Sequence, residues 1–266
     1  MLVDLHLHTR FSFDSREAME NYIEKAKECG ASALGFSEHY DYDAYVDGAD
    51  IPETDIAAYT AYLDGLKQRS GNVKLLKGIE FGYRDFAVDE YKKLIDKFDF
   101  DYIINSVHTL PNRGDCFHDG FFRGKTLREN YFDYFEAVLE SVKADYDFQI
   151  IGHIGYVSRY RTESGAAIHY KDFSDILDEI LKEIIARDKC LEINSSTGKS
   201  GSQFLPDCDV VDRYLELGGE KLSFGSDAHS VSAFLNKGAK LKDYLNRRGV
   251  KRLFYYEKRK PVTYLV

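Results

Sequence analysis

Short runs of apolar residues alternate with longer amphipathic segments along most of the 266-residue chain. The short runs have the length and bounding residues that are typical of buried β-strands. They predict seven strands, at residues 1–7, 33–37, 74–79, 102–107, 148–151, 190–193 and 221–224. In the tail, residues 253–256 predict one more short strand or edge segment.

The segments between these runs carry apolar residues three or four positions apart, which predicts amphipathic helices. The first helix follows Ser15, and Gly30 is placed to end it. Thr126 and Glu129 form a capping box, in which each side chain satisfies a free backbone amide at the start of a helix. The remaining helices are expected after residue 54 and near residues 88–98, 173–185, 209–217 and 231–246.

The alternation of strands and helices predicts βα units and a parallel sheet, and hence the α/β class. A single α/β barrel of about 250 residues is ordinary, so the chain length suits one barrel. The sequence contains no internal repeat detectable by residue identity, no low-complexity tract and no linker. We therefore expect one domain over residues 1–266.

Potential metal ligands stand at six of the seven predicted strand ends. His6 and His8 lie two residues apart, so strand alternation puts both imidazoles on one side. In a βα barrel the carboxyl ends of the strands converge on one face, which brings residues distant in sequence together. The candidate ligands, including Asp14 six residues after His8, are His6, His8, Asp14, His39, Glu80, His108, His153, Asp227 and His229.

Imidazoles and carboxylates without thiolates are suitable ligands for Zn, Mn or Fe, and the sequence does not choose among these metals. Nine candidates exceed what one ion needs, which favours two or three divalent ions. Clustered divalent ions suit phosphate-ester hydrolysis, because they activate water and neutralise phosphoryl oxygens.

The composition of the chain disfavours some classes of binding partner and indicates the cellular compartment. The net charge of −9 disfavours general binding to nucleic acid or to anionic membranes. No apolar stretch is long enough for a transmembrane helix, and the first residues lack the pattern of a secretory signal. The four cysteines are far apart and form no Cys-x-x-Cys pair, which indicates a reducing cytoplasm.

The joint motif resembles the PHP superfamily, named for polymerase and histidinol phosphatase. The matching segments run from His6 to His229 and are His6-Leu-His8-Thr-Arg-Phe-Ser12, Ser37-Glu-His39, Gly78-Ile-Glu80, Ser106-Val-His108, Gly152-His153 and Ser226-Asp227-Ala-His229. Chain length, ligand spacing and Arg159-Tyr160 after His153 look most like the stand-alone histidinol-phosphate phosphatases of this superfamily.

This resemblance implies a distorted (β/α)7 barrel, similar to a TIM barrel, with a trinuclear metal site. By analogy, the first ion would be held by His6, His8, Glu80 and Asp227. Glu80 would bridge to a second ion held by His108 and His153. Asp14, His39 and His229 would hold the third. Asp227 or His229 would pass a proton to the departing alkoxide, and no Ser or Cys nucleophile is expected.

Substrate contacts are expected in the loops that follow the strands. Arg159 lies six residues after His153, and its planar guanidinium matches the oxygens of a phosphate. Lys199 and Arg161 are further cationic candidates. An imidazole and an amine on the substrate would need an acidic or aromatic partner, for which the candidates are Asp115, Asp119 and Tyr160.

Three functions compete at this point. The first is a metal-dependent phosphomonoesterase that hydrolyses L-histidinol phosphate in histidine biosynthesis. The second is a PHP-type phosphoesterase for another substrate, such as a nucleotide or phosphotyrosine. The third is a non-catalytic, metal-stabilised scaffold domain. All nine ligand positions hold a competent residue type, which favours catalysis. Oligomeric state does not follow from the sequence.

Overall fold

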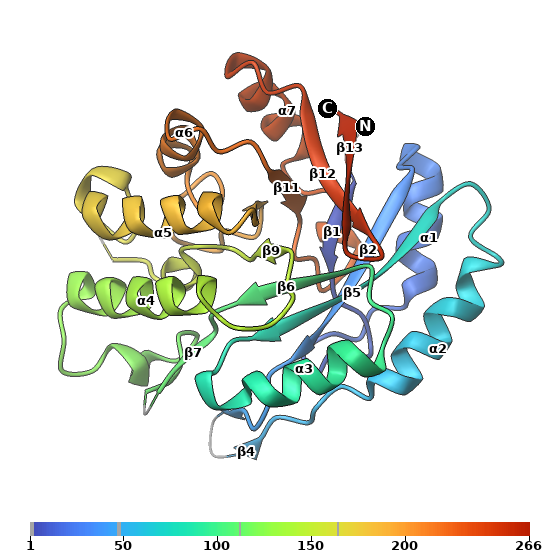
Figure 1. Cartoon of the computed structure of the whole chain (residues 1–266), viewed down its shortest axis with the longest axis horizontal. Coiled ribbons are helices and arrows are strands. Elements are labelled where there is room, and N and C mark those ends of the chain that lie inside the picture. The colour runs from blue at the N-terminus through green and yellow to red at the C-terminus, as the bar shows by residue number, and fades with distance from the viewer. Residues whose placement is uncertain (1–2, 47–48, 112, 164) are drawn as a thin grey trace.

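The computed structural model describes residues 3–46, 49–111, 113–163 and 165–266. Its centre is a sheet of seven parallel strands in the spatial order β1-β2-β5-β6-β9-β10-β11 (Figure 1). These strands are β1 (Asp4–Leu7), β2 (Ala33–Tyr40), β5 (Lys74–Gly82), β6 (Tyr102–Ser106), β9 (Ile150–Ile151), β10 (Cys190–Asn194) and β11 (Leu222–Gly225). All seven predicted strands are confirmed, although their bounds shift by a few residues and residues 1 and 2 lie outside the described ranges.

The sheet curls into a nearly closed barrel. The segment directly after β11 returns to β1, where the backbone N–H of His8 donates to the carbonyl of Ala228 at 2.9 Å. A parallel bridge between Leu7 and Ala228 joins the two edges. The predicted distorted (β/α)7 barrel is therefore confirmed.

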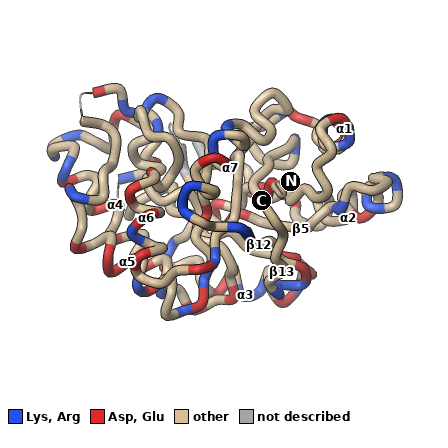
Figure 2. Tube along the Cα trace, turned by 90° about the horizontal axis from the view of Figure 1, so that it is seen from above, with Lys and Arg blue, Asp and Glu red and all other residues tan. Residues whose placement is uncertain are grey.

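Helices surround the barrel and bury their apolar faces against it (Figure 1). They are α1 (Met19–Cys29), α2 (Ile56–Lys67), α3 (Val88–Lys97), α4 (Leu127–Val142), α5 (Ser174–Ala186), α6 (Cys208–Glu216) and α7 (Gly238–Arg247). The capping box at the start of α4 is present as predicted, and Gly30 ends α1 in the left-handed conformation. Lys and Arg residues alternate with Asp and Glu along the outer helices (Figure 2).

The prediction of one helix over residues 231–246 is wrong at its start. Val231–Ala233 forms a short 3-10 turn, and α7 begins only at Gly238. Leu235 and Lys237 have positive φ angles of 55° and 57°, which no right-handed helix accommodates. The Nζ of Lys237 instead donates to the hydroxyl of Thr197 at 2.5 Å, which ties this segment to the loop after β10.

The tail forms a complete hairpin rather than a single short strand. β12 (Arg252–Glu257) pairs antiparallel with β13 (Lys260–Leu265). Two loops also contain short antiparallel pairs that the sequence pattern does not predict: β3 (Tyr45–Val46) with β4 (Ala49–Asp50), and β7 (Thr109–Leu110) with β8 (Gly114–Asp115).

The hairpin covers the amino ends of the barrel strands. Tyr256 of β12 is buried in an interior cluster with Val3, Leu5 and Tyr102. The hydroxyl of Tyr102 donates to the carbonyl of Leu5 at 2.6 Å, across the inside of the barrel. Gly35 provides the room for this ring, since a Cβ there would lie 2.1 Å from the Tyr102 hydroxyl. The amino end of the barrel is therefore filled by side chains, which leaves the carboxyl end for chemistry.

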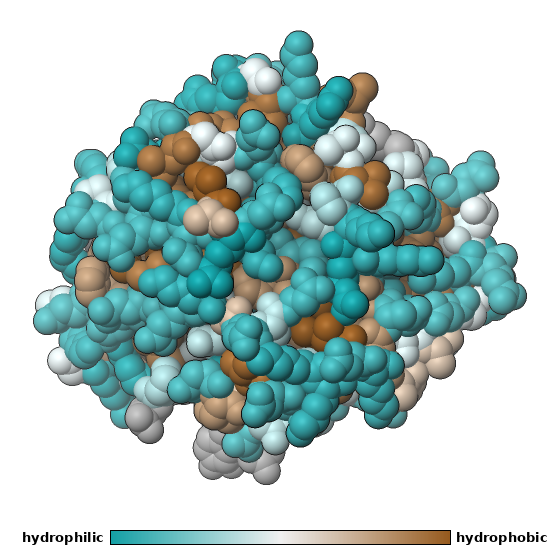
Figure 3. Space-filling view, in the orientation of Figure 1, coloured by the Kyte–Doolittle hydropathy of each residue, from teal (hydrophilic) through white to brown (hydrophobic). Residues whose placement is uncertain are grey.

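The surface is mainly polar. In the view of Figure 3, hydrophilic residues cover most of the face, and hydrophobic residues show only in small separate groups. Within the part of the chain that the structure describes, every helix is too short or too polar to cross a membrane.

Candidate metal centre and active site

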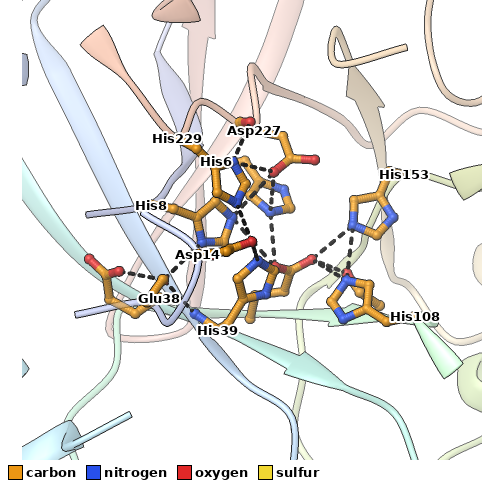
Figure 4. A network of polar contacts seen from close by, with 12 residues as sticks. His6, His8, Asp14, Glu38, His39, His108, His153, Asp227 and His229 are labelled. Atoms are coloured by element: carbon orange, nitrogen blue, oxygen red, sulfur yellow. Dashed lines mark hydrogen bonds and ion pairs between the residues drawn. The ribbon is translucent and has the colours of Figure 1, made fainter. Parts of the chain in front are cut away.

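The carboxyl ends of the barrel strands hold a compact group of imidazoles and carboxylates (Figure 4). The chain brings all nine predicted ligands into this group, from β1, β2 and β5 and from the loops after β1, β6, β9 and β11. β2 and β5 run slightly past the predicted ends, and their register places His39 beside Glu80. The barrel topology, rather than any local motif, assembles the cluster.

Glu80 lies at the centre of the group and is fully buried. Its two carboxylate oxygens lie 2.9–3.5 Å from ring nitrogens of five histidines: His6, His8, His39, His108 and His153. The hydroxyl of Ser106 donates to Oε1 of Glu80 at 2.6 Å. Each oxygen of Glu80 thus faces its own group of imidazoles: Oε2 faces His6, His8 and His39, and Oε1 faces His108 and His153.

Asp227 and Asp14 lie on either side of His229. The Oδ1 of Asp227 lies 3.3 Å from Nε2 of His8, while the Oδ2 of Asp14 lies 3.0 Å from Nε2 of His229. Asp227 has a φ of 53°, a conformation that Asp tolerates better than most residues and that is common at functional sites. His229 and Asp14 are partly exposed, whereas His6, His8 and Glu80 are buried. His229 and Asp14 therefore lie on the solvent side of the cluster.

The carboxylates and imidazoles shift one another's pKa values. Burial opposes the charge of Glu80, but His6, His108 and His39 outweigh burial and hold the pKa of its carboxyl well below the usual range. Burial lowers the pKa of His8 well below its usual value, and the neighbouring rings of His39 and His229 lower it further. Against the effect of burial, nearby carboxylates raise the pKa values of His6, His39 and His108 above the usual value. Because metals are ligated by ionised carboxylates and neutral imidazoles, a cation that binds here would take the place of the protons on these rings.

The residues present fit a group of divalent cations. Four sets of three side chains have ligand atoms that all lie within 4.8 Å of one another: His8, His39 and His229; His6, His8 and Glu80; His6, His153 and Asp227; and His39, Glu80 and His108. Among the described residues, the buried Nε2 atoms of His6 and His8 and the Oε2 of Glu80 have no hydrogen-bond partner. Buried polar atoms are normally satisfied, so these atoms indicate a site for cations.

Arg159 lies directly beside this cluster. Its guanidinium is buried and donates to Oδ2 of Asp227 at 2.6 Å. It also lies over the ring of Tyr156, 4.9 Å from the centroid. The Nε of Arg159 is buried without a hydrogen-bond partner among the described residues. The predicted phosphate-binding candidate is thus within reach of the candidate metal centre.

Tyr160 and Asp115 lie further out along the same side. Tyr160 is half-buried and packs edge-on against Phe117 and Tyr156, with ring centroids 4.7 and 5.8 Å away. Asp115 accepts a hydrogen bond from the hydroxyl of Tyr156 at 3.3 Å. Burial raises the pKa of Asp115. These residues form an aromatic and acidic rim next to His108 and His153.

Lys199, Arg161 and Asp119, the other candidates for substrate contacts, lie further from the ligand cluster than Arg159 does, and their roles stay predictions. The side chain of Lys199 is exposed, and this residue reaches the site through its backbone N–H, which donates to the carbonyl of Arg159 at 2.8 Å. Arg161 pairs with Asp119 and Glu163 and lies over the ring of Phe122. The side chain of Asp119 is 87% exposed and that of Arg161 is 12% exposed, so only the Asp119 end of this ion pair lies at the surface.

Several buried side chains around the ligands were not predicted from the sequence to be part of the site. The buried carboxylates of Glu192 and Asp41 contact the rings of His6 and His108. The buried Glu38 accepts from the hydroxyl of Ser12, which lies 3.1 Å from Nδ1 of His8. Asn194 contacts both Glu192 and Asp227, at 3.2 and 3.5 Å. The available signal was a charged residue inside or directly after an apolar run, as in Cys190-Leu191-Glu192-Ile193.

Comparison with known proteins now identifies the family. A family model described as "PHP domain" matches residues 4–196. The chain belongs to the PHP domain family.

Two relatives of this PHP chain are both named as histidinol-phosphatases. It is 30% identical over 262 residues to a Clostridium acetobutylicum protein named "Probable histidinol-phosphatase", covering 97% of this chain and 98% of that protein. It is also 30% identical over 233 residues to the histidinol-phosphatase of Lactococcus lactis, covering 85% and 84% of the two chains.

A solved PHP structure matches the fold over nearly its full length. The crystal structure of histidinol phosphate phosphatase from Lactococcus lactis, complexed with zinc, L-histidinol and phosphate, has a TM-score of 0.87 and 26% sequence identity. The match covers 98% of each chain. The comparison therefore extends across the segment after residue 196, which contributes Asp227 and His229 to the cluster of this PHP chain.

Proposed function

We propose that this protein is a metal-dependent phosphomonoesterase that hydrolyses L-histidinol phosphate to L-histidinol and inorganic phosphate, a step of histidine biosynthesis. The observation that carries this conclusion is the match over 98% of both chains to a histidinol phosphate phosphatase solved with zinc, L-histidinol and phosphate. The nine-residue cluster at the carboxyl end of the barrel supplies the chemistry that such an enzyme needs.

We propose that the cluster holds two or three divalent ions, of Zn, Mn or Fe. His6, His8, Glu80 and Asp227 would hold the first ion. Glu80 would be shared with a second ion held by His108 and His153, and Asp14, His39 and His229 would hold a third. The contacts of Glu80 on both oxygens and the closeness of Asp14 to His229 support this division. When bound, such ions lower the pKa of water, neutralise phosphoryl oxygens and offset charge on the leaving oxygen.

The side chains around the ions have separate tasks. Arg159 would bind the phosphate, because its guanidinium is fixed beside Asp227 and supplies the planar donors that phosphate oxygens accept. Water adds its oxygen to phosphorus as the bond between phosphorus and the ester oxygen breaks, and the ester oxygen takes up a proton and leaves as the alcohol. Asp227 or His229 would pass on this proton, which the attacking water releases, and His229 is the more exposed of the two.

The rim would recognise the rest of the substrate. Tyr160 and Asp115 would contact the imidazole and amine of L-histidinol phosphate, since a carboxylate and an aromatic face both attract a cation. Lys199 would add a positive charge at the mouth. The small ester is the expected partner, with neither nucleic acid nor membrane. We also propose that residues 1–266 make one domain and that the protein works in the cytoplasm, where its four cysteines would remain reduced.

The test is phosphate release by the purified, metal-loaded protein. L-histidinol phosphate would be compared with a nucleoside monophosphate, phosphotyrosine and p-nitrophenyl phosphate, alongside an Asp227→Asn/His229→Asn double variant. L-histidinol phosphate should lead by orders of magnitude in kcat/KM, and the double variant should be inactive. A different leading ester would overturn the substrate assignment, and absence of turnover with metal bound would favour a scaffold role.

A further inference from the structure

Two buried carboxylates outside the proposed ligand set contact ligand imidazoles from behind. The Oε1 of Glu192 lies 2.6 Å from Nδ1 of His6. The Oδ1 of Asp41 lies 2.8 Å from Nδ1 of His108. Glu192 is 1% exposed and Asp41 is 7% exposed, so water does not screen either contact.

The opposite nitrogen of each ring faces the cluster. The Nε2 of His6 lies 3.2 Å from Oε2 of Glu80, and the Nε2 of His108 lies 3.2 Å from Oε1 of the same residue. Each ring thus faces a carboxylate on both sides, and its contact with Glu192 or Asp41, at 2.6 or 2.8 Å, is the shorter one. A carboxylate only accepts hydrogen bonds, so the shorter contact assigns the proton of the neutral ring to Nδ1. The free lone pair is then on Nε2, where a cation between the ring and Glu80 would take it up.

We propose that Asp41 and Glu192 are positioning residues, which hold His108 and His6 as Nδ1–H tautomers and aim their Nε2 lone pairs at the ions. This inference rests on the metal centre of the proposed function. It assigns the two carboxylates a task separate from ligation. A carboxylate behind a ligating imidazole fixes the ring orientation and increases its basicity toward the metal.

Glu192 is itself held in place by two further hydrogen bonds. The Oε2 of Glu192 accepts the backbone N–H of His153 at 2.7 Å and the side-chain amide of Asn194 at 3.2 Å. The same residue therefore also fixes the backbone of a third candidate ligand. These extra bonds leave Glu192 little freedom to swing into the cluster and ligate an ion itself.

Glycines make room for the two carboxylates. A Cβ at Gly225 would lie 2.1 Å from Oε1 of Glu192, and a Cβ at Gly82 would lie 1.9 Å from Oδ1 of Asp41. Each glycine lies at the carboxyl end of its barrel strand, β11 or β5. The strands thus leave a space behind His6 and His108 that a carboxylate fills.

The experiment uses zinc as the probe and removes each charge with little change of shape. Metal-free wild type, Asp41→Asn and Glu192→Gln would be titrated with zinc in competition with a chromogenic chelator. Asp101→Asn is the matched control, since Asp101 binds backbone amides of Lys77 and Lys258 at the amino end of the barrel. We expect at least one zinc ion to bind about 10- to 100-fold more weakly in each test variant, and no change in the control. Zinc affinities equal to wild type would overturn the proposal.

A second measurement needs no variant. Nitrogen-15 NMR of the histidine rings in the zinc-loaded wild type should show His6 and His108 protonated at Nδ1 and ligated through Nε2. Protonation at Nε2 would overturn the proposal even if a variant failed to fold. A wild type that binds no zinc would overturn the metal centre and this proposal together. Zinc binding with these tautomers but without turnover of L-histidinol phosphate would overturn only the proposed function.

Discussion

The guanidinium of Arg159 lies 2.6 Å from Oδ2 of Asp227, and both side chains are buried. The other oxygen of Asp227 faces the cluster, 3.3 Å from Nε2 of His8. Burial opposes the charge of Asp227, but Arg159 holds the pKa of that carboxyl well below its usual range. One carboxylate thus connects the candidate phosphate-binding side chain to the candidate metal centre.

Arg159→Lys should lower kcat/KM for L-histidinol phosphate by about 10- to 150-fold, because a hydrogen bond to a charged group contributes roughly 1.5–3 kcal/mol and Lys lacks the planar fork. Steady-state phosphate release measures the loss. Arg248→Lys is the matched control, since Arg248 pairs with Asp212 of α6 and its side chain is 44% exposed, and should stay within about twofold of wild type. Equal kcat/KM in wild type and Arg159→Lys would refute phosphate binding by Arg159.

Gly198→Ala should impair catalysis by displacing Arg159. Gly198 has a φ of 55°, and a Cβ there would lie 2.2 Å from the carbonyl oxygen of Arg159. Gly201→Ala is the matched control, because Gly201 has a φ of 83° but nothing within 4 Å of the added Cβ. Both variants should lose roughly 1–3 kcal/mol of stability through backbone strain. Only Gly198→Ala should also lose kcat/KM, by about tenfold or more, if Arg159 contributes as much as an ordinary charged hydrogen bond. Equal losses of kcat/KM in both variants would show that strain, rather than the position of Arg159, limits activity.

Tyr256→Ala should destabilise the barrel without touching the cluster. Tyr256 is 3% exposed and fills the amino end of the barrel beside Tyr102. Removing a buried aromatic side chain typically costs about 3–5 kcal/mol. Urea unfolding of the metal-free protein gives the free energy of unfolding directly. Thr263→Ser, at an exposed position on β13, should change this free energy by less than about 0.5 kcal/mol. Equal free energies of unfolding for the two variants would contradict the conclusion that Tyr256 of the hairpin fills the amino end of the barrel.

The fold and the nine candidate ligands could be predicted from the sequence because their signals are local. The barrel topology then brings the strand ends to one face. Each apolar run identifies its own strand, and each ligand comes from a strand end or the loop beside it. Glu80 could be placed near His153 without any long-range information, because parallel barrel strands carry both to one face. The analogy to a known family added the division of these ligands among ions.

The features that the sequence did not predict depend on contacts between distant segments. The start of α7 is delayed because Lys237 reaches Thr197, a contact that hydrophobic periodicity does not record. The contacts of Asp41 with His108 and of Glu192 with His6 join residues far apart in the sequence, so no local pattern predicts them. The backbone N–H of Lys199 holds the carbonyl of Arg159, a contact that the sequence did not indicate, while the role of the Lys199 side chain stays a prediction.

The measurement that tests the central claim most directly is a metal titration read by activity. Metal-free protein would receive zinc or manganese stepwise, with bound metal and phosphate release from L-histidinol phosphate followed together. We predict no turnover without metal, and activity that rises with occupancy and reaches its limit at two or three ions per chain. Full activity in the metal-free protein, or no hydrolysis of L-histidinol phosphate at full occupancy, would contradict the account.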